Sequence, residues 1–359
     1  MPFELSTLLL RADVAALATP EGRRVGSAGH DRARDFLCKR LSSLGLEHYH
    51  AAASYSLPYR TGGQAFFNVV GVVPGADRQA RPVLLGAHYD SVLDAPCADD
   101  NAAAVAITLA VAERLRHHAQ QPARDVLVTF FDAEEPPYFL SPAMGSIRFG
   151  RDQMDARGVG CALIQDLTGH DVRLPLPLAG GTAALPEIKD LVFMTGAESH
   201  PQLASLVGAA LAGTSGSDDN HDYHHLPLVA ARNAHVGDMS DHHIFRTLGL
   251  PYLFFSCGRW EHYHQRSDTP EKLNYEKMAR LAALLSDVTL HCAAHDLSLK
   301  VAAGEGETDT TIAFEIELLE RAFGPALLPA LLRLAGVPKL RGRADLNALA
   351  AALTSSAGL

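Results

Sequence analysis

Five short apolar runs alternate along this chain with longer stretches that carry apolar residues at helical spacing. The runs are FNVVGVV from Phe67, PVLLGAHYD from Pro82, DVLVTFFDAEE from Asp125, CALIQDL from Cys161 and LPYLFFSC from Leu250. Nearly continuous apolar runs of this length predict strands that are buried on both faces. The helical stretches cover residues 30–46, 101–118, 202–212 and 275–295. Strands that alternate with helices predict a layered α/β fold with a mostly parallel central sheet.

Residues 1–298 fit one large domain that begins with a helix at residues 1–18. Its rhythm breaks at residues 169–235, where LPLPLAGGTAALPE is rich in Pro and Gly and TSGSDDNHDYHHLP is polar. This composition predicts an insertion of loops around a helix, suited to a lid or a substrate wall. Residues 299–359 start with the linker-like VAAGEGETDT and continue as a leucine- and alanine-rich stretch. We expect a linker and a helical C-terminal extension there.

The charge balance argues against some classes of partner. The chain has 31 Lys and Arg against 41 Asp and Glu, a net charge of -10. This excess of acid disfavours nucleic acid or an anionic membrane as the main partner. The five cysteines are widely spaced without a CxxC pair, and no apolar stretch reaches the length of a membrane span. We therefore expect a cytoplasmic protein, of open oligomeric state.

Charged side chains stand where three of the predicted strands end. His88 and Asp90 alternate in GAHYDS and so point to one face. Glu134 and Glu135 follow VLVTFFDA, and Asp166 directly follows CALIQ. Ligands of open α/β sheets bind beyond the carboxyl ends of the strands. Adjacent carboxylates at the end of an apolar strand repel each other unless a cation neutralises them. These strand ends therefore predict a cation site.

Two loops add candidate ligands. Asp99 and Asp100 precede a long helix in CADDN, and His264 and Asp268 follow the last strand in EHYHQRSDTP. Helix capping would explain the first pair alone, and a solvated loop would explain the second. A single ordinary explanation does not cover all of these sites together, so we predict metal binding. The mixture of imidazole and carboxylate favours zinc, with cobalt or manganese as substitutes.

The ordered motifs HYDS, ADDN, DAEE, a strand-end Asp, SDH and YHxxxDTP resemble the double-zinc aminopeptidase family, metallopeptidase family 28, which also contains glutaminyl cyclases. The resemblance covers residues 24–290. It implies a three-layer αβα fold with a mostly parallel mixed central sheet, like that of zinc-dependent exopeptidases. It also implies two Zn²⁺ ions per chain, held by His88 and Asp166 at one site and Glu135 and His264 at the other, with Asp100 between them.

The same resemblance assigns the remaining residues. It implies that Glu134 is the catalytic base, which takes a proton from water and passes it to the leaving amine. Asp90 and Asp268 would be supporting residues, and a non-proline cis peptide would follow Asp100. Asp99 would then be left to cap the next helix.

The resemblance implies an aminopeptidase that hydrolyses N-terminal residues from a peptide or small amide. Two alternatives stay open: a glutaminyl-cyclase-like aminoacyltransferase, because PPYFLSPAMGSIRF is similar to the cyclase branch, and a binding domain without catalysis. The full set of two-metal ligands favours hydrolysis. The candidate substrate-pocket residues are Asp241, Trp260, Tyr263 and the run 221–225. Asp241 could instead cap a helix, and Trp260 could instead pack in the core.

Overall fold

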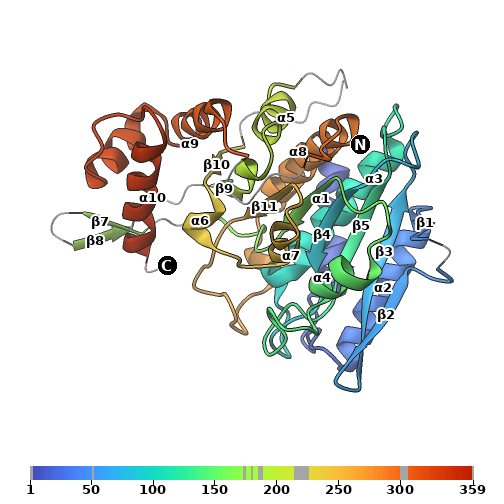
Figure 1. Cartoon of the computed structure of the whole chain (residues 1–359). Helices are drawn as coiled ribbons and strands as arrows, with labels where there is room; N and C mark the ends of the chain where they lie inside the picture. Colours follow the sequence, from blue (N-terminus) through green and yellow to red (C-terminus); the bar gives the residue numbers. More distant parts are fainter. Residues whose placement is uncertain are drawn as a thin grey trace.

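The computed structural model of the chain describes residues 3–50, 52–172, 175–178, 181–184, 189–213, 226–299 and 306–357. The run 221–225 and the first half of the linker-like VAAGEGETDT, residues 301–305, lie outside this part. Among the described residues, nine strands form a central sheet in the order β1-β3-β5-β4-β6-β11-β9-β10, with β2 paired to β3 (Figure 1). Its strands are β1 (Glu47–His48), β2 (Ser56–Thr61), β3 (Gln64–Val73), β4 (Val83–His88), β5 (Val126–Phe131), β6 (Cys161–Gln165), β9 (Val192–Thr195), β10 (Leu228–Ala230) and β11 (Tyr252–Ser256).

The middle of the sheet is parallel and its flanks are antiparallel. β5, β4, β6 and β11 run in one direction, whereas β3 is antiparallel to β5 and β9 is antiparallel to β11. All five apolar runs named above are strands of this sheet. The predicted mixed sheet is therefore confirmed, and the carboxyl ends of its four central strands share one edge.

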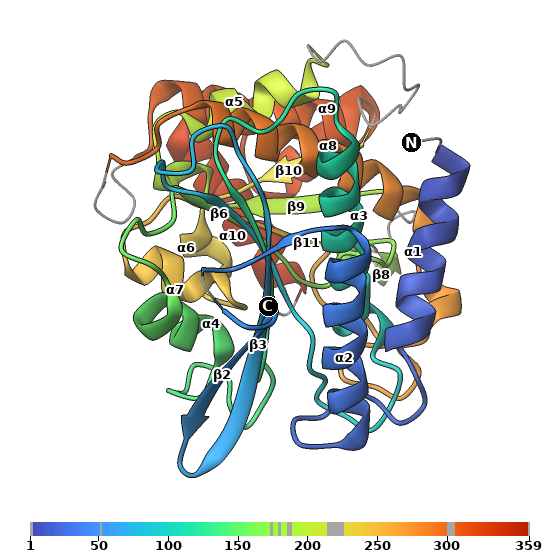
Figure 2. The ribbon, with the colours of Figure 1, turned by 90° about the vertical axis from the view of Figure 1, so that its right-hand side faces the viewer.

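Helices cover both faces of the sheet (Figure 2). Alternate side chains of each strand enter different cores: Leu163 of β6 packs with Leu85 on one face, while Ile164 packs with Leu84 on the other. α1, α2, α3, α5 and α8 close the larger core, and α4 and α7 close the smaller one. The three-layer prediction is thus confirmed. The helices are α1 (Phe3–Leu17), α2 (Ala28–Ser43), α3 (Ala104–His117), α4 (Gly145–Arg148), α5 (Leu203–Leu211), α6 (Asn233–Val236), α7 (His242–Thr247), α8 (Tyr275–Ala294), α9 (Asp309–Leu334) and α10 (Arg343–Ala357).

The segment 169–235 is more than loops around a helix, so that expectation is wrong in part. The expected helix is α5, but β9 and β10 of the same segment are strands of the central sheet. β9 pairs antiparallel with β11 and parallel with β10. These strands have only four and three residues, too few to show a period, and their pairing partners are distant in sequence. A small separate hairpin, β7 (Pro175–Leu178) with β8 (Gly181–Ala184), lies in the same segment.

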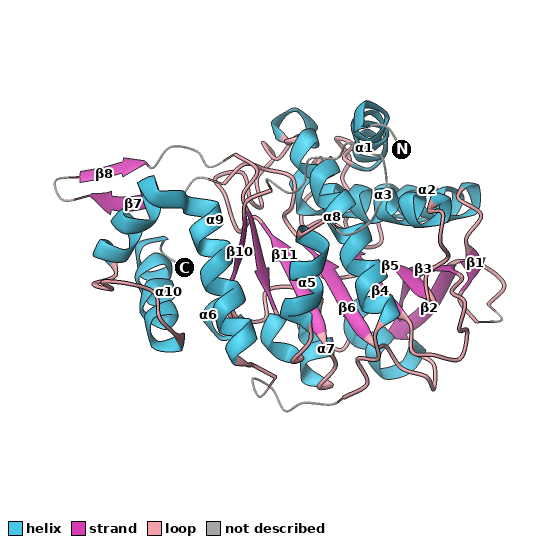
Figure 3. Cartoon of the chain, turned by 90° about the horizontal axis from the view of Figure 1, so that it is seen from above, coloured by secondary structure: helices cyan, strands magenta, loops and turns pink. Residues whose placement is uncertain are grey.

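The C-terminal extension is helical, as expected, and it packs on the sheet. α9 contacts β10 and α5, and α10 contacts α9, α6 and β7 (Figure 3). α9 is interrupted at Gly324, which has a φ of 57° and is followed in the chain by Pro325. Because β10 ends the sheet, α9 covers an edge that would otherwise offer unpaired backbone groups. The boundary between a domain 1–298 and an extension 299–359 stays a prediction. Among the described helices, none is long and apolar enough to cross a membrane.

The start of α9 offers a stability test. The Thr308 hydroxyl accepts a hydrogen bond from the Thr311 N–H at 3.2 Å, and the Thr311 hydroxyl accepts one from the Thr308 N–H at 3.2 Å. We expect Thr308→Ala to lower the free energy of unfolding by about 1 kcal/mol, since the first turn of α9 loses its cap. Thr310→Ala, at an exposed position of the same turn, is the matched control. Equal urea midpoints for the two variants would contradict the prediction.

Candidate metal centre and active site

Three neighbouring parallel strands deliver the first candidate ligands. His88 is the last residue of β4, Glu134 and Glu135 follow β5 within four residues, and Asp166 directly follows β6. Since these strands are parallel and adjacent, their carboxyl ends bring the four side chains together. The loop before α3 adds Asp100. All five side chains are buried.

Asp100 lies between two histidines. Its Oδ1 is 3.3 Å from Nε2 of His88, and its Oδ2 is 3.3 Å from Nε2 of His264, which comes from the loop after β11. Beyond these, His88 Nε2 lies 3.5 Å from Asp166 Oδ1, and His264 Nε2 lies 3.2 Å from Glu135 Oε2. The structure therefore brings all five predicted ligands together, in two groups that share one carboxylate.

The spacing of these atoms fits zinc. Two ligand atoms about 2.1 Å from a tetrahedral zinc ion lie about 3.4 Å apart, and the measured imidazole–carboxylate separations are 3.2 to 3.5 Å. Within the described part of the chain, several of the atoms lack a hydrogen bond of normal geometry although they are buried. These are both ring nitrogens of His88, Asp100 Oδ2, Glu135 Oε1, Asp166 Oδ1 and His264 Nε2. Buried polar atoms of this kind are costly unless something binds them, so the residues present fit a metal.

The charges at the site also favour a bound cation. Burial raises the pKa of Glu134 well above its ordinary value, and the nearby Asp166 and Glu135 raise it further. Burial and the charge of Asp100 raise the pKa of Glu135 to about 8. Burial also raises the pKa of Asp166. These shifts reflect too little positive charge near the carboxylates, and divalent cations would supply it.

Glu134 differs from the other carboxylates in its position. Its Oε2 is 3.7 Å from His88 Nε2, farther than the oxygens of Asp100 and Asp166. It lies close enough to His88 and Asp166 to share an ion with them, and it also lines the cavity described below. Asp100, Glu135 and Asp166 line this cavity as well, so it is the longer distance from His88 that sets Glu134 apart and leaves it freer to act on a substrate.

Asp90 and Asp268 hold the backbone that carries the ligands. Asp90 accepts hydrogen bonds from the N–H groups of Glu134, at 3.1 Å, and Glu135, at 3.2 Å. Its Oδ1 is also 3.4 Å from Nδ1 of His88. Asp268 accepts from the N–H groups of Asp99, at 2.9 Å, and Asp100, at 3.1 Å. Both contacts are those of supporting residues, since they fix the positions of groups that could bind metal.

Asp99 does not cap α3, so that expectation is wrong. Its Oδ1 accepts a hydrogen bond from the Gly169 N–H at 2.6 Å, and its Oδ2 lies 2.6 Å from Nδ1 of His170. The carboxylate thus ties the loop before α3 to the loop after β6, a long-range contact that local sequence does not reveal. The peptide bond between Asp100 and Asn101 is cis, as the resemblance implied.

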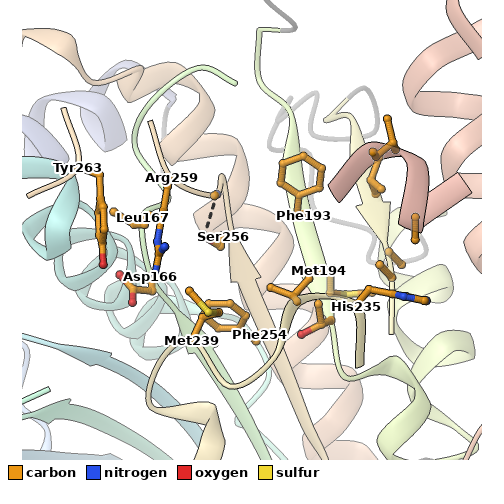
Figure 4. Close-up of a pocket in the computed structure, with 18 of the residues that line it drawn as sticks. Asp166, Leu167, Phe193, Met194, His235, Met239, Phe254, Ser256, Arg259 and Tyr263 are labelled. Carbon is orange, nitrogen blue, oxygen red and sulfur yellow. Dashed lines mark hydrogen bonds between the residues drawn. The ribbon is translucent and has the colours of Figure 1, made fainter. Parts of the chain in front are cut away.

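A cavity of about 540 Å³ adjoins the donor cluster (Figure 4). Tyr263 lines it, beside Asp166 and opposite Phe193. Trp260 is not among the described residues that line it; its ring stacks on His170 with a centroid separation of 4.5 Å. Trp260 thus packs on the loop that Asp99 holds in place. Of the three candidate pocket residues Asp241, Trp260 and Tyr263, only Tyr263 lines this cavity.

Asp241 lies buried near the donors instead of lining the cavity. It immediately precedes α7, but its side chain makes no capping hydrogen bond there. Burial raises the pKa of Asp241 to about 7. The nearby His88 lowers this pKa, but by less than burial raises it. The capping alternative is thus wrong, and the carboxyl adds to the excess of buried acid around the ligands.

Arg23 is a supporting residue that the sequence patterns did not reveal. Its buried guanidinium donates hydrogen bonds to the carbonyls of Tyr89, at 2.9 Å, Pro96, at 2.8 Å, and Cys97, at 2.9 Å. These hydrogen bonds fix the backbone of the segment between His88 and Asp100. In the sequence Arg23 lies between Gly22 and Arg24 and belongs to no recognisable motif, so only the structure shows that it fixes this backbone segment.

Comparison with known proteins agrees with the geometry. The profile of Peptidase family M28 matches residues 68–289, more than half of the chain. The chain belongs to peptidase family M28. The uncharacterized protein YfbL of Escherichia coli (strain K12) is 29% identical in an alignment of 219 positions that covers 55% of this chain. The match spans 63% of the length of YfbL.

Solved structures of peptidases and of a glutaminyl cyclase have a similar fold. The LapA aminopeptidase of Legionella pneumophila has a TM-score of 0.59 and 17% identity, over 81% of this chain and 75% of its own. The glutaminyl cyclase of Porphyromonas gingivalis has a TM-score of 0.58 and 17% identity, over 79% and 97%. A Zn-dependent exopeptidase of Parabacteroides distasonis has a TM-score of 0.56 and 16% identity, over 79% and 97%. At such identities the likeness shows the fold alone.

The raised pKa values predict how the chelator-treated protein responds to pH. A carboxyl whose pKa is raised by folding stabilises the folded state at low pH, and this is lost as pH rises through the folded value. That value is about 8 for Glu135 and about 7 for Asp241. We expect the melting temperature to fall between about pH 5 and pH 8, and zinc to restore more of it at pH 8 than at pH 5. A melting temperature that rises over this range in calorimetry would refute the assignment.

The backbone contacts of Asp268 predict an effect on metal affinity. We expect Asp268→Asn to weaken zinc binding by about 10- to 100-fold, because an amide cannot accept both N–H groups with its two terminal atoms. Competition with a chromogenic chelator measures the change. Asp35→Asn, an exposed acid on α2, is the matched control and should bind zinc like the unaltered protein.

Proposed function

We propose that the protein is a zinc-dependent aminopeptidase that uses two zinc ions per chain to hydrolyse N-terminal residues from peptides. The observation that carries the proposal is the position of Asp100, with one oxygen toward His88 and the other toward His264. A carboxylate shared in this way joins two donor groups into a single two-metal site. His88 and Asp166 would complete one side, and Glu135 and His264 the other.

The chain's own residues account for the proton transfers of hydrolysis. Bound zinc would polarise the scissile carbonyl and lower the pKa of water. Glu134, at the border of the cavity, accepts the proton of the attacking water and passes it to the leaving amine. Asp90 fixes the backbone at Glu134 and so fixes the direction of the base.

The proposed restriction to N-terminal residues rests on family and fold. Family M28 and the aminopeptidase and exopeptidase neighbours support removal of terminal residues. The cavity beside the donors would receive the terminal residue, while the rest of the peptide leaves toward solvent. A peptide or small amide is the proposed partner, and the cytoplasm stays the expected location.

The direct test is digestion of a peptide library by the zinc-loaded protein, with and without chelator, read by mass spectrometry. Each free peptide is paired with its N-acetylated form. We expect stepwise shortening of free peptides only, abolished by chelator. Loss of ammonia from peptides that begin with Gln, without shortening, would show cyclase activity instead; no reaction with zinc bound would favour a binding domain.

Glu134→Gln tests the assigned base. We expect it to keep both zinc ions, since the other five candidate ligands remain, and to lose about 10²- to 10⁴-fold in turnover. Elemental analysis and peptide hydrolysis measure the two effects. Exposed Glu320→Gln on α9 is the control and should match the unaltered protein in both. Normal hydrolysis by Glu134→Gln would remove the residue from the mechanism.

A further inference from the structure

The cavity beside the donors reaches the C-terminal helices, which lie beyond the family match at residues 68–289. Its lining includes Glu135 and His264 at the metal site and Leu346 and Leu349 on α10. Its volume of about 540 Å³ falls within the range of roughly 300–1,000 Å³ typical of small-molecule sites. One continuous space therefore joins the catalytic groups to a segment outside the residues that the family profile matches.

The wall between these two ends is mostly apolar. It is formed by side chains of β9, β11, α9 and α10, among them Phe193, Phe254, Leu319, Phe323, Leu346 and Leu349. Figure 4 shows Phe193 and Met194 of β9 on the side of the cavity away from Asp166 and Tyr263. An apolar wall of this length favours an apolar ligand group over a charged one.

The charged groups of the far wall neutralise one another. Arg343 donates two hydrogen bonds to Glu315, at 2.7 and 2.9 Å, and lies 2.8 Å from Glu307. Nε2 of His235 lies 3.1 Å from Oδ1 of Asn347. The charge of Arg343 is thus paired with those of Glu315 and Glu307, so this wall has little unpaired charge to offer to a ligand.

The apolar face of α10 is turned toward this space. Leu346, Leu349 and Leu353 follow at intervals of three and four residues and so share one face of the helix, and all three line the cavity. The ion pair of Arg343 with Glu315 fixes the start of α10 against α9. α10 therefore presents an apolar surface at the end of the cavity away from the donors.

We propose that α9 and α10 form an apolar subsite of the active site, and that the group on the carbonyl side of the scissile amide is bulky and apolar and reaches α10. This rests on the proposed function, since that site would hold the carbonyl. A substrate chain cannot continue through the wall of α10, so the group in this space must be a terminal one. Each methylene that it buries would strengthen binding about fourfold.

The test is a binding series that needs no turnover. The zinc-loaded full chain is titrated with butanoate, hexanoate, octanoate and decanoate in a calorimeter, since the carboxylate can occupy the donor site while the alkyl chain enters the cavity. We expect the dissociation constant to fall about fourfold per methylene until the cavity is full. Leu353→Trp, which narrows the cavity at α10, should end this gain at a shorter chain.

Leu334→Trp on α9 is the matched control, because Leu334 is exposed and does not line the cavity. Leu349→Ala, which widens the space, should extend the gain to longer chains and guards against a folding defect of the tryptophan variant. A dissociation constant independent of chain length, or the same series in Leu353→Trp as in Leu334→Trp, would overturn the subsite. If the series holds but no peptide is hydrolysed, the proposed aminopeptidase activity fails and the subsite stands.

Discussion

The concentration of carboxylates at one edge of the central sheet is the constraint on which the rest of the structure depends. Asp90, Asp100, Glu134, Glu135 and Asp166 are all buried there, within reach of two histidines. Such a cluster is unstable on its own, because each charge opposes the ionisation of its neighbours. Much of the surrounding architecture acts to hold the cluster together until cations are bound.

The fold supplies this support through backbone contacts more than through side-chain pairs. Asp90 and Asp268 accept N–H groups of the segments that carry the ligands, and Arg23 donates to the carbonyls of the same region. Parallel strands β4, β5 and β6 fix where these segments begin. The ligand positions are thus determined by the sheet and by loops that are hydrogen-bonded to one another, as a preorganised metal site requires.

The sequence was sufficient for the sheet centre and the ligand cluster because both leave local patterns. Apolar runs that lead into His88, Glu135 or Asp166 predict buried strands with candidate ligands at their ends, and this prediction needs no knowledge of contacts distant in sequence. Asp99 was misassigned because its carboxylate contacts Gly169 and His170, about 70 residues away. β9 and β10 were missed because strands of four and three residues show no period. The leucine- and alanine-rich C-terminal stretch predicted a helical extension, but only the structure shows that leucines of α10 line a cavity.

The loop after β11 carries two functions four residues apart. His264 faces Asp100 as a candidate ligand, and Asp268 on the same loop grips the backbone of Asp100. A displacement of this loop would therefore withdraw His264 from the donor cluster and at the same time release the backbone that positions Asp100. Because Asp100 lies between His88 and His264, this one loop would control the cation affinity of both donor groups at once.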